Sequence, residues 1–250
     1  MKKKVVFLYS ELSGYFLACI KQLGSIPSVD IHIVHWPINK EAPFIFLEYG
    51  NINLYDRGKY KDEQLIKLID TINPSFIYAS GWMDKGYLKI CRRYKGKIPV
   101  VVGFDNQWEA TFRQWLMVLT SSFTLRAYYN HCWIPGEPQK KYAELLGFPI
   151  NNILTGFYCC DYNFFNSQYL KAKACKQLKF PKRFIYVGRY VAQKGIEDLW
   201  NAFVTLHEKH PNDWELWCLG TGDIPPFQHP RIKHFGFVQP SDMSHFIENA

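Results

Sequence analysis

The sequence predicts an α/β fold built on parallel sheets, and three features of the 250-residue chain support this prediction. Short apolar segments of strand composition alternate with longer segments whose apolar residues recur at helical spacing. The segment 98–104 (IPVVVGF) is apolar almost without a break, as expected of a strand buried on both faces of a parallel sheet. Hydrophobic residues make up 48% of the chain, which is enough to build such a core and argues against disorder.

The elements of the first 165 residues follow in order along the chain. The basic start leads into an apolar run that ends at Ser10-Glu11 without a cleavage site of small residues, so we interpret it as a first strand rather than a signal peptide. Strands are expected at 4–9, 30–36, 75–80, 98–104 and 131–135, with a strand-rich segment at 42–57. Helices are expected at 15–23, 62–72, 85–94, 108–125 and 138–146.

The C-terminal part continues the same alternation. A strand is expected at 184–187, a helix from Ile196, a further strand and glycine turn within 214–223, and a strand, turn and short helix within 231–250. The intervening segment is polar and basic. We therefore expect an N-terminal Rossmann-like domain at 1–165, a basic linker at 166–183 and a C-terminal domain at 184–250.

The chain carries a net charge of +8, and its distribution is uneven. No acidic residue lies between Tyr162 and Ile196, where eight cations occur. Two interpretations stay open: a solvated linker kept soluble by lysines, or a basic wall beside an anionic ligand or a membrane surface. Nucleic acid is a poorer match, because no helix-turn-helix, zinc or RNP-like pattern accompanies the charge.

The segment 184–203 (FIYVGRYVAQKGIEDLWNAF) predicts an anion site. An apolar strand ends at Gly188-Arg189, and a loop carries Lys194-Gly195 to the start of a helix. Backbone N–H groups at a helix start, beyond the carboxyl end of a strand, favour a bound anion. Arg189 can contact two oxygens of a diphosphate, and Lys194 adds a mobile positive charge.

These residues carry a resemblance to a known family. GRYVAQKG (188–195) resembles the Gly-Arg…Lys-Gly signature that opens the second domain of GT-B glycosyltransferases of the family 4 type. The segments 133–165, 214–223 and 231–250 resemble adjoining parts of that family, and the resemblance extends loosely over the residues before Trp133. It implies a GT-B-like fold with one complete Rossmann-like domain and the first half of a second one, facing it across a cleft.

The resemblance also implies an activity. Such enzymes move a sugar from a nucleotide-diphosphate donor, UDP- or GDP-linked, to a glycan or lipid-linked acceptor, here in cell-surface polysaccharide synthesis. Arg189 and Lys194 are then catalytic, since they stabilise the departing diphosphate. Gly188 and Gly195, with Gly220 in the turn LGTGD, are donor-binding positions.

An alternative of another class stays open. The family's acidic motif, two Glu separated by seven residues, would follow the last matched segment and is not found in the 250 residues. The chain is then a fragment, or a truncated and non-catalytic module that binds a nucleotide or docks onto a partner. A Rossmann-type oxidoreductase is disfavoured, because no Gly-x-Gly-x-x-Gly follows the first strand.

Three further positions are candidates for the site. Gly14 follows the first strand, where the family has a glycine-rich turn, although a simple helix start explains it as well. Asp105 follows the strand 98–104, where the family often has a His-Asp pair; the His is replaced here by Phe104. Asp105 either orients an acceptor hydroxyl or the donor sugar, or it caps the next helix. Gly222, with Gly220, either admits the nucleotide or forms a plain tight turn.

The expected helix 108–125 and the residues just after it mix aromatic and basic side chains, including Trp115, Phe123, Arg126 and Tyr128. They pack in the core or on the surface, or the helix lies on a membrane that carries a lipid-linked acceptor. We expect a cytoplasmic protein, at the inner face of the membrane in the second case. With no Asp-x-Asp pair and no His or Cys at ligand spacing, we expect no metal and no cofactor.

Overall fold

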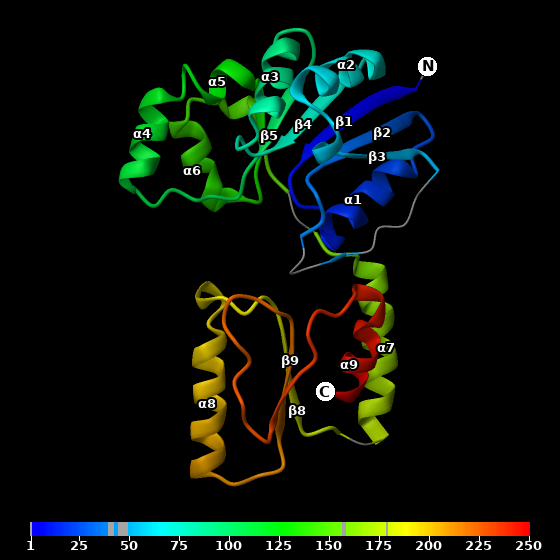
Figure 1. The fold of residues 1–250 in the computed structure, drawn as a ribbon, viewed down its shortest axis with the longest axis vertical. Coiled ribbons are helices and arrows are strands. Elements are labelled where there is room, and N and C mark those ends of the chain that lie inside the picture. Colours follow the sequence, from blue (N-terminus) through cyan, green and yellow to red (C-terminus); the bar gives the residue numbers. More distant parts are fainter. Residues whose placement is uncertain (1, 40–42, 45–49, 157–158, 179) are drawn as a thin grey trace. The chain divides into compact units, whose positions relative to one another are not determined.

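The computed structural model describes residues 2–39, 43–44, 50–156, 159–178 and 180–250 (Figure 1). The chain divides into two compact units. Unit 1 comprises Met1–Pro37 and Phe46–Cys160, and unit 2 comprises Ile38–Ile45 and Asp161–Ala250. The expected α/β class is confirmed, because every strand pair within the named sheets of the described residues is parallel.

Unit 1 is built on a seven-stranded sheet in the order β3-β2-β1-β4-β5-β6-β7. Its strands are β1 (Lys3–Tyr9), β2 (Val29–His35), β3 (Ile52–Asp56), β4 (Phe76–Ser80), β5 (Val100–Gly103), β6 (His131–Trp133) and β7 (Ile153–Leu154). The strand order reverses between β1 and β4, which places a topological switch point there. Of the strand-rich segment expected at 42–57, residues 52–56 form β3, whereas 45–49 lie outside the described residues.

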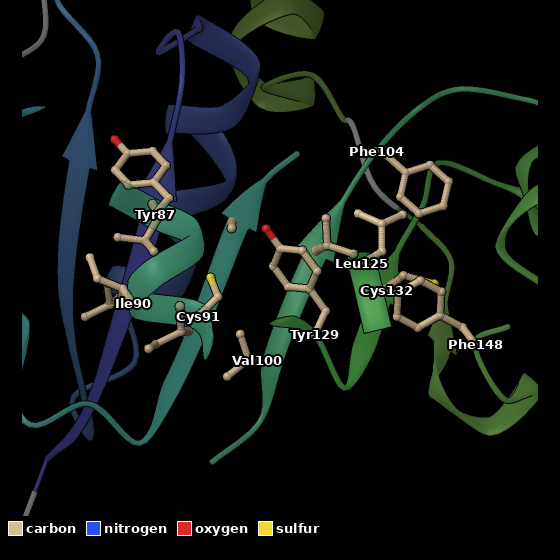
Figure 2. Close-up of a cluster of buried hydrophobic side chains, with 14 of the residues drawn as sticks. Tyr87, Ile90, Cys91, Val100, Phe104, Leu125, Tyr129, Cys132 and Phe148 are labelled. Atoms are coloured by element: carbon tan, nitrogen blue, oxygen red, sulfur yellow. The ribbon is translucent and has the colours of Figure 1, made fainter. Parts of the chain in front are cut away.

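The helices of unit 1 cover both faces of its sheet. They are α1 (Gly14–Gly24), α2 (Asp62–Ile72), α3 (Lys85–Tyr94), α4 (Phe112–Thr120), α5 (Leu125–Tyr128) and α6 (Glu137–Leu145), with single 3-10 turns η1 (Arg57–Lys59) and η2 (Ile150–Asn152). Alternate residues of β1 point to opposite faces of the sheet, and each face packs against its own layer of helices. Phe7 and Tyr9 pack with α1, whereas Val6 and Leu8 face the larger core that α2, α3, α5 and α6 share (Figure 2).

The helix expected at 108–125 is the main error in the predicted elements. Helix α4 begins at Phe112, because the Thr111 hydroxyl accepts from the backbone of Gln114 and the Gln114 side chain accepts from that of Thr111. Before this capping box, Ala110 has φ 55°, which separates the preceding segment from the helix. Four turn residues then divide α4 from α5.

Unit 2 has a parallel three-stranded sheet in the order β10-β9-β8. Its strands are β8 (Arg183–Val187), β9 (Glu215–Leu219) and β10 (Ile232–His234), and its helices are α7 (Tyr162–Leu178), α8 (Ile196–Lys209) and α9 (Met243–Asn249), with 3-10 turns η3 (Ala192–Lys194) and η4 (Pro240–Asp242). Helix α8 buries Trp200 and Phe203 against the sheet, and α9 packs with α7. Most of the expected basic linker, 166–183, is thus helical.

A charged ladder of Arg183, Glu215 and Lys233 joins the three strands of unit 2 near their amino ends. One Glu215 oxygen accepts from Arg183 Nε at 3.1 Å, and the other lies 2.7 Å from Lys233 Nζ. The Trp217 indole donates to Glu215 at 2.9 Å, and the Arg183 guanidinium lies over the Trp217 ring. These donors, Lys233 foremost, lower the pKa of Glu215 from 4.5 to about 2.

Candidate functional site

A cavity of about 420 Å³ opens at the carboxyl ends of the central strands of unit 1. The residues that follow β1, β2, β4 and β5 line it, so it lies at the switch point, where open parallel sheets commonly bind ligands. Its lining residues are Tyr9, Ser10, Glu11, Tyr15, Trp36, Tyr78, Ser80, Gly81, Trp82, Met83, Gly103, Phe104, Asp105 and Asn106. Aromatic walls combined with a few hydroxyls and carboxylates suit a polyhydroxylated ligand that also has apolar faces.

Hydrogen bonds hold the strand ends of this cavity together. The Ser80 hydroxyl accepts from the backbone N–H of Ser10 at 2.8 Å and lies 3.2 Å from the Ser10 hydroxyl. The buried Tyr87 hydroxyl lies within hydrogen-bond distance of the carbonyl oxygens of Tyr9 and Val34. Burial raises the pKa of Tyr87 well above its ordinary value, so the hydroxyl keeps its proton. These bonds join the ends of β1, β2 and β4 beside the cavity.

Asp84 supports the cavity from behind. It caps α3 by accepting from the backbone N–H groups of Gly86 and Tyr87, and its other oxygen accepts from Trp36 Nε1 and Arg57 Nε, both at 3.1 Å. Trp36 lines the cavity, so one carboxylate both starts a helix and fixes a wall of the site. Both Asp84 and Arg57 are largely buried, so removing either one would leave the other charge buried without one of its partners.

The structure separates the two unit 1 candidates. Asp105 lies in the cavity lining, two residues after the end of β5. Its alternative role as the cap of the next helix is wrong, since Thr111 caps α4. Gly14 is the first residue of α1 and is not among the residues that line the cavity, although the neighbouring Tyr15 is.

The unit 2 candidates lie together at the carboxyl ends of β8 and β9. The backbone N–H of Gly188 donates to Leu219, and that of Tyr190 donates to Thr221 at 2.9 Å, so the two loops run side by side. A Cβ on Gly220 would meet the Gly188 carbonyl, and one on Gly222 would meet the Tyr190 carbonyl. Glycine is required at both positions because the two backbones are in contact.

Arg189 and Lys194 are exposed on this edge of unit 2. Within the described part of the chain, neither forms an ion pair or a side-chain hydrogen bond. Lys194 ends η3, and Gly195 follows with φ 62°, a left-handed conformation that turns the chain into α8. The Arg189 backbone is fixed by the Tyr186 hydroxyl, which donates to its carbonyl at 2.9 Å. Both cations are thus positioned by the backbone while their charges stay available to an anion.

Tyr190 fills the space beneath this loop. Its ring is buried against Trp200, and its hydroxyl lies 3.0 Å from His234 Nδ1. His234 Nε2 lies 2.9 Å from the Phe227 carbonyl, so in a neutral ring Nε2 donates and Nδ1 accepts from Tyr190. Sequence reasoning assigned no role to Tyr190, nor to Ser80 and Trp36 in unit 1. Ser80 and Trp36 lie at the carboxyl ends of strands, so the same rule that identified Asp105 could have identified them.

No metal site accompanies these residues: the described chain has no group of three His, Cys, Asp or Glu side chains arranged to hold an ion. None of its described helices is long and apolar enough to cross a bilayer.

Comparison with known proteins identifies the fold. No family model matches the chain, and no curated protein matches its sequence. Solved structures do match over nearly the full chain. HepE from Anabaena, in complex with UDP and glucose, has a TM-score of 0.62 at 14% identity, covering 100% of this chain and 73% of that one.

Two further structures have similar values. A glycosyltransferase from Rickettsia africae has a TM-score of 0.61 at 13% identity, covering 100% of this chain and 71% of that one. The UDP-GlcNAc 2-epimerase from Neisseria meningitidis, bound to UDP-GlcNAc, has 0.57 at 12%, covering 98% and 74%. These likenesses show a shared GT-B-type fold among enzymes of UDP-sugars. The finer assignment to the family 4 type stays a prediction.

Proposed function

We propose that this chain binds a nucleotide-diphosphate sugar in unit 2 and transfers its sugar to a glycan or lipid-linked acceptor held in unit 1. One observation carries the proposal. Two exposed cations, Arg189 and Lys194, flank a glycine-built edge in unit 2 and have no carboxylate partner in the described chain. Similar structures in complex with UDP and glucose or with UDP-GlcNAc support this choice of ligand.

The chemistry follows from where negative charge develops. When the bond between the sugar and the diphosphate breaks, the sugar becomes oxocarbenium-like and charge collects on the departing phosphate oxygens. Preorganised cations stabilise that charge, and removing one such donor costs about 2–4 kcal/mol of transition-state stabilisation. Arg189 and Lys194 take this role, while Gly188, Gly195, Gly220 and Gly222 let the backbone approach the diphosphate.

Residues of unit 1 take the acceptor role. Asp105 lies in a cavity with the hydroxyls of Ser10 and Ser80 and with aromatic walls. A carboxylate there orients an acceptor hydroxyl by accepting its hydrogen bond. Gly14 begins the helix beside this cavity. We place the reaction in cell-surface polysaccharide synthesis, at the cytoplasmic side of the membrane.

Nucleotide binding tests the donor site. We expect UDP or GDP to raise the melting temperature of the purified chain, and Arg189→Ala or Lys194→Ala to weaken the affinity by roughly 10- to 100-fold, as for a lost charge-assisted hydrogen bond. Lys209→Ala is the matched control, because this exposed lysine ends the same helix that Lys194 precedes. If no nucleotide shifts the melting temperature, or if all three variants bind alike, the donor site is wrong.

Product analysis separates transfer from the alternatives. Incubation with UDP-sugars should release UDP as the sugar passes to water or to the hydroxyl of an added glycan acceptor, and Asp105→Asn should slow the acceptor-dependent release without changing the affinity for UDP. UDP binding without any turnover would favour the non-catalytic binding module. The fold is shared with UDP-GlcNAc 2-epimerases, so formation of an epimer of the donor sugar would replace the transfer proposal.

A further inference from the structure

Helix α4 presents an apolar outer face to solvent. Phe112, Trp115, Leu116 and Leu119 recur at helical spacing on one side and are 83%, 50%, 52% and 74% exposed. Phe123, in the turn that follows, is 84% exposed. We call these five side chains the α4 face; the helix that carries most of them is labelled in Figure 1.

The opposite side of α4 packs against the core of unit 1. Met117 and Val118 pack against the large hydrophobic cluster of unit 1, and Gln114 is used by the capping box. A surface helix ordinarily pairs one apolar side with a polar one, whereas α4 is apolar on both sides. Burial in the fold therefore explains its inner side and leaves the α4 face unexplained. An apolar patch of this kind on a globular unit marks an interaction site.

Helices α4 and α5 themselves carry only positive charges, and the exposed Glu109 precedes α4, where its backbone N–H donates to the Gln114 side chain. No Asp or Glu occurs from Ala110 to Gly136, a segment that contains α4 and α5. Arg113 on α4 and Arg126 on α5 are exposed in it. The positive field extends to Lys95, whose pKa is lowered by burial and by the nearby Arg126. An apolar helix face whose own segment carries arginines and no acids complements an anionic lipid surface, where apolar side chains enter the acyl boundary and cations meet headgroups.

We propose that the α4 face binds the surface of an anionic membrane, with Arg113 and Arg126 at the level of the headgroups. The half-exposed Trp115 packs edge-on against Trp108, which fixes its indole at the rim of the face. Aromatic side chains of this type favour the boundary between headgroups and acyl chains. Tyr128, by contrast, packs against the core and takes no part. The proposal goes beyond the donor site and does not depend on it.

Vesicle binding without nucleotide tests the proposal. We expect the protein to sediment with vesicles of phosphatidylcholine and phosphatidylglycerol and far less with phosphatidylcholine alone. Leu116→Glu/Leu119→Glu should lower the partition coefficient at least ~100-fold, since two leucines no longer enter the acyl region. Arg113→Gln and Arg126→Gln should each lower the partition coefficient about fivefold, and a higher salt concentration should lower it as well.

Matched variants provide the controls. Ile150→Glu changes an apolar residue of unit 1 that is 60% exposed, and Lys67→Gln removes an exposed cation on α2; neither should change vesicle binding. Phe112→Ser/Phe123→Ser gives a second disruption of the α4 face. An unchanged melting temperature shows that these variants fold, and hydrogen exchange in α4 should slow on vesicles.

Three outcomes would overturn the proposal. The protein does not bind anionic vesicles, or binding survives both double variants, or the α4 face proves to join two copies of the chain. In the last case the wild type is dimeric by light scattering, Leu116→Glu/Leu119→Glu is monomeric, and neither binds vesicles. Loss of nucleotide binding by Arg189→Ala leaves vesicle binding intact, so the two proposals fail separately.

Discussion

Replacing Gly222 by alanine tests whether the two loops of the candidate donor site are in contact. Gly222 is not in the left-handed region, so alanine brings no dihedral strain and only the added Cβ matters. That Cβ would lie 2.8 Å from both the nitrogen and the carbonyl carbon of Tyr190, and closer still to its oxygen. Ordinary contact begins at 3.4 Å, so the Tyr190 backbone must move by about 0.6 Å or more.

The cost follows from what Tyr190 holds. Its carbonyl accepts from Ile224 and its N–H donates to Thr221, so the movement disturbs two backbone hydrogen bonds. Overpacking costs about 1–3 kcal/mol, and one lost hydrogen bond adds about 1 kcal/mol. We expect Gly222→Ala to lower stability by about 2–4 kcal/mol, which lowers the melting temperature of a chain of this size by roughly 5–15 °C.

Differential scanning calorimetry and UDP titration measure the two consequences. Gly50→Ala is the control: this glycine is also outside the left-handed region, and a Cβ on it would meet no atom within 4 Å. It should melt within about 0.5 kcal/mol of the wild type. If Gly222→Ala melts within 1–2 °C of the wild type and binds UDP equally well, the close approach of the loops is refuted.

Two further predictions concern the supports of each unit. Glu215→Gln removes the centre of the charged ladder and should destabilise the protein by about 1–3 kcal/mol at neutral pH. Because folding lowers the pKa of Glu215 from 4.5 to about 2, this stabilisation is full above about pH 5 and fades as the pH falls toward 2. Denaturation of both proteins from pH 7 to pH 3 should therefore give converging stabilities, and a constant difference would contradict the role of the carboxylate. Asp84→Ala should lower the stability by about 2–4 kcal/mol, since it uncaps α3 and leaves Arg57 without one of its carboxylates. Asp84→Asn can keep the cap and should lower the stability less. Equal losses of stability for the two variants in urea unfolding would refute the capping contribution.

The sequence was sufficient to predict elements with sharp local signals. Helices α2 and α3 were predicted at their observed bounds, 62–72 and 85–94. Asp84 precedes α3 and caps it, and Asn73 ends α2 in the left-handed conformation. Such signals act over a few residues and are therefore readable before the fold is known.

The start of α4 was not predictable in the same way. Apolar residues at helical spacing continue upstream to Trp108, so periodicity extended the helix too far. The observed start depends on Thr111, Gln114 and the left-handed Ala110, the last of which leaves no mark in the sequence. Apolar residues at helical spacing also predict that a helix is buried. They do not show that only one of the two apolar sides of α4 packs against the core.

The candidate site was predictable where it follows the ends of strands. That rule identified Gly188, which directly follows β8, and Asp105, which is the second residue after β5. The pairing of Trp36 with Asp84 joins residues 48 positions apart, and the contact of Tyr190 with His234 joins residues 44 apart. Contacts at that separation are set by tertiary packing, and a single sequence does not reveal them.

The charged ladder of unit 2 has a consequence for redesign. It aligns the three strands at their amino ends, whereas every ligand-binding candidate of that unit lies beyond their carboxyl ends, after Val187 and Leu219. In this parallel sheet, the ion pairs that align the strands therefore lie at the opposite end from the loops that carry the candidate ligand-binding residues. Under the proposed function, we expect loops exchanged at these two joints to change donor preference while the ion pairs between the strands stay intact.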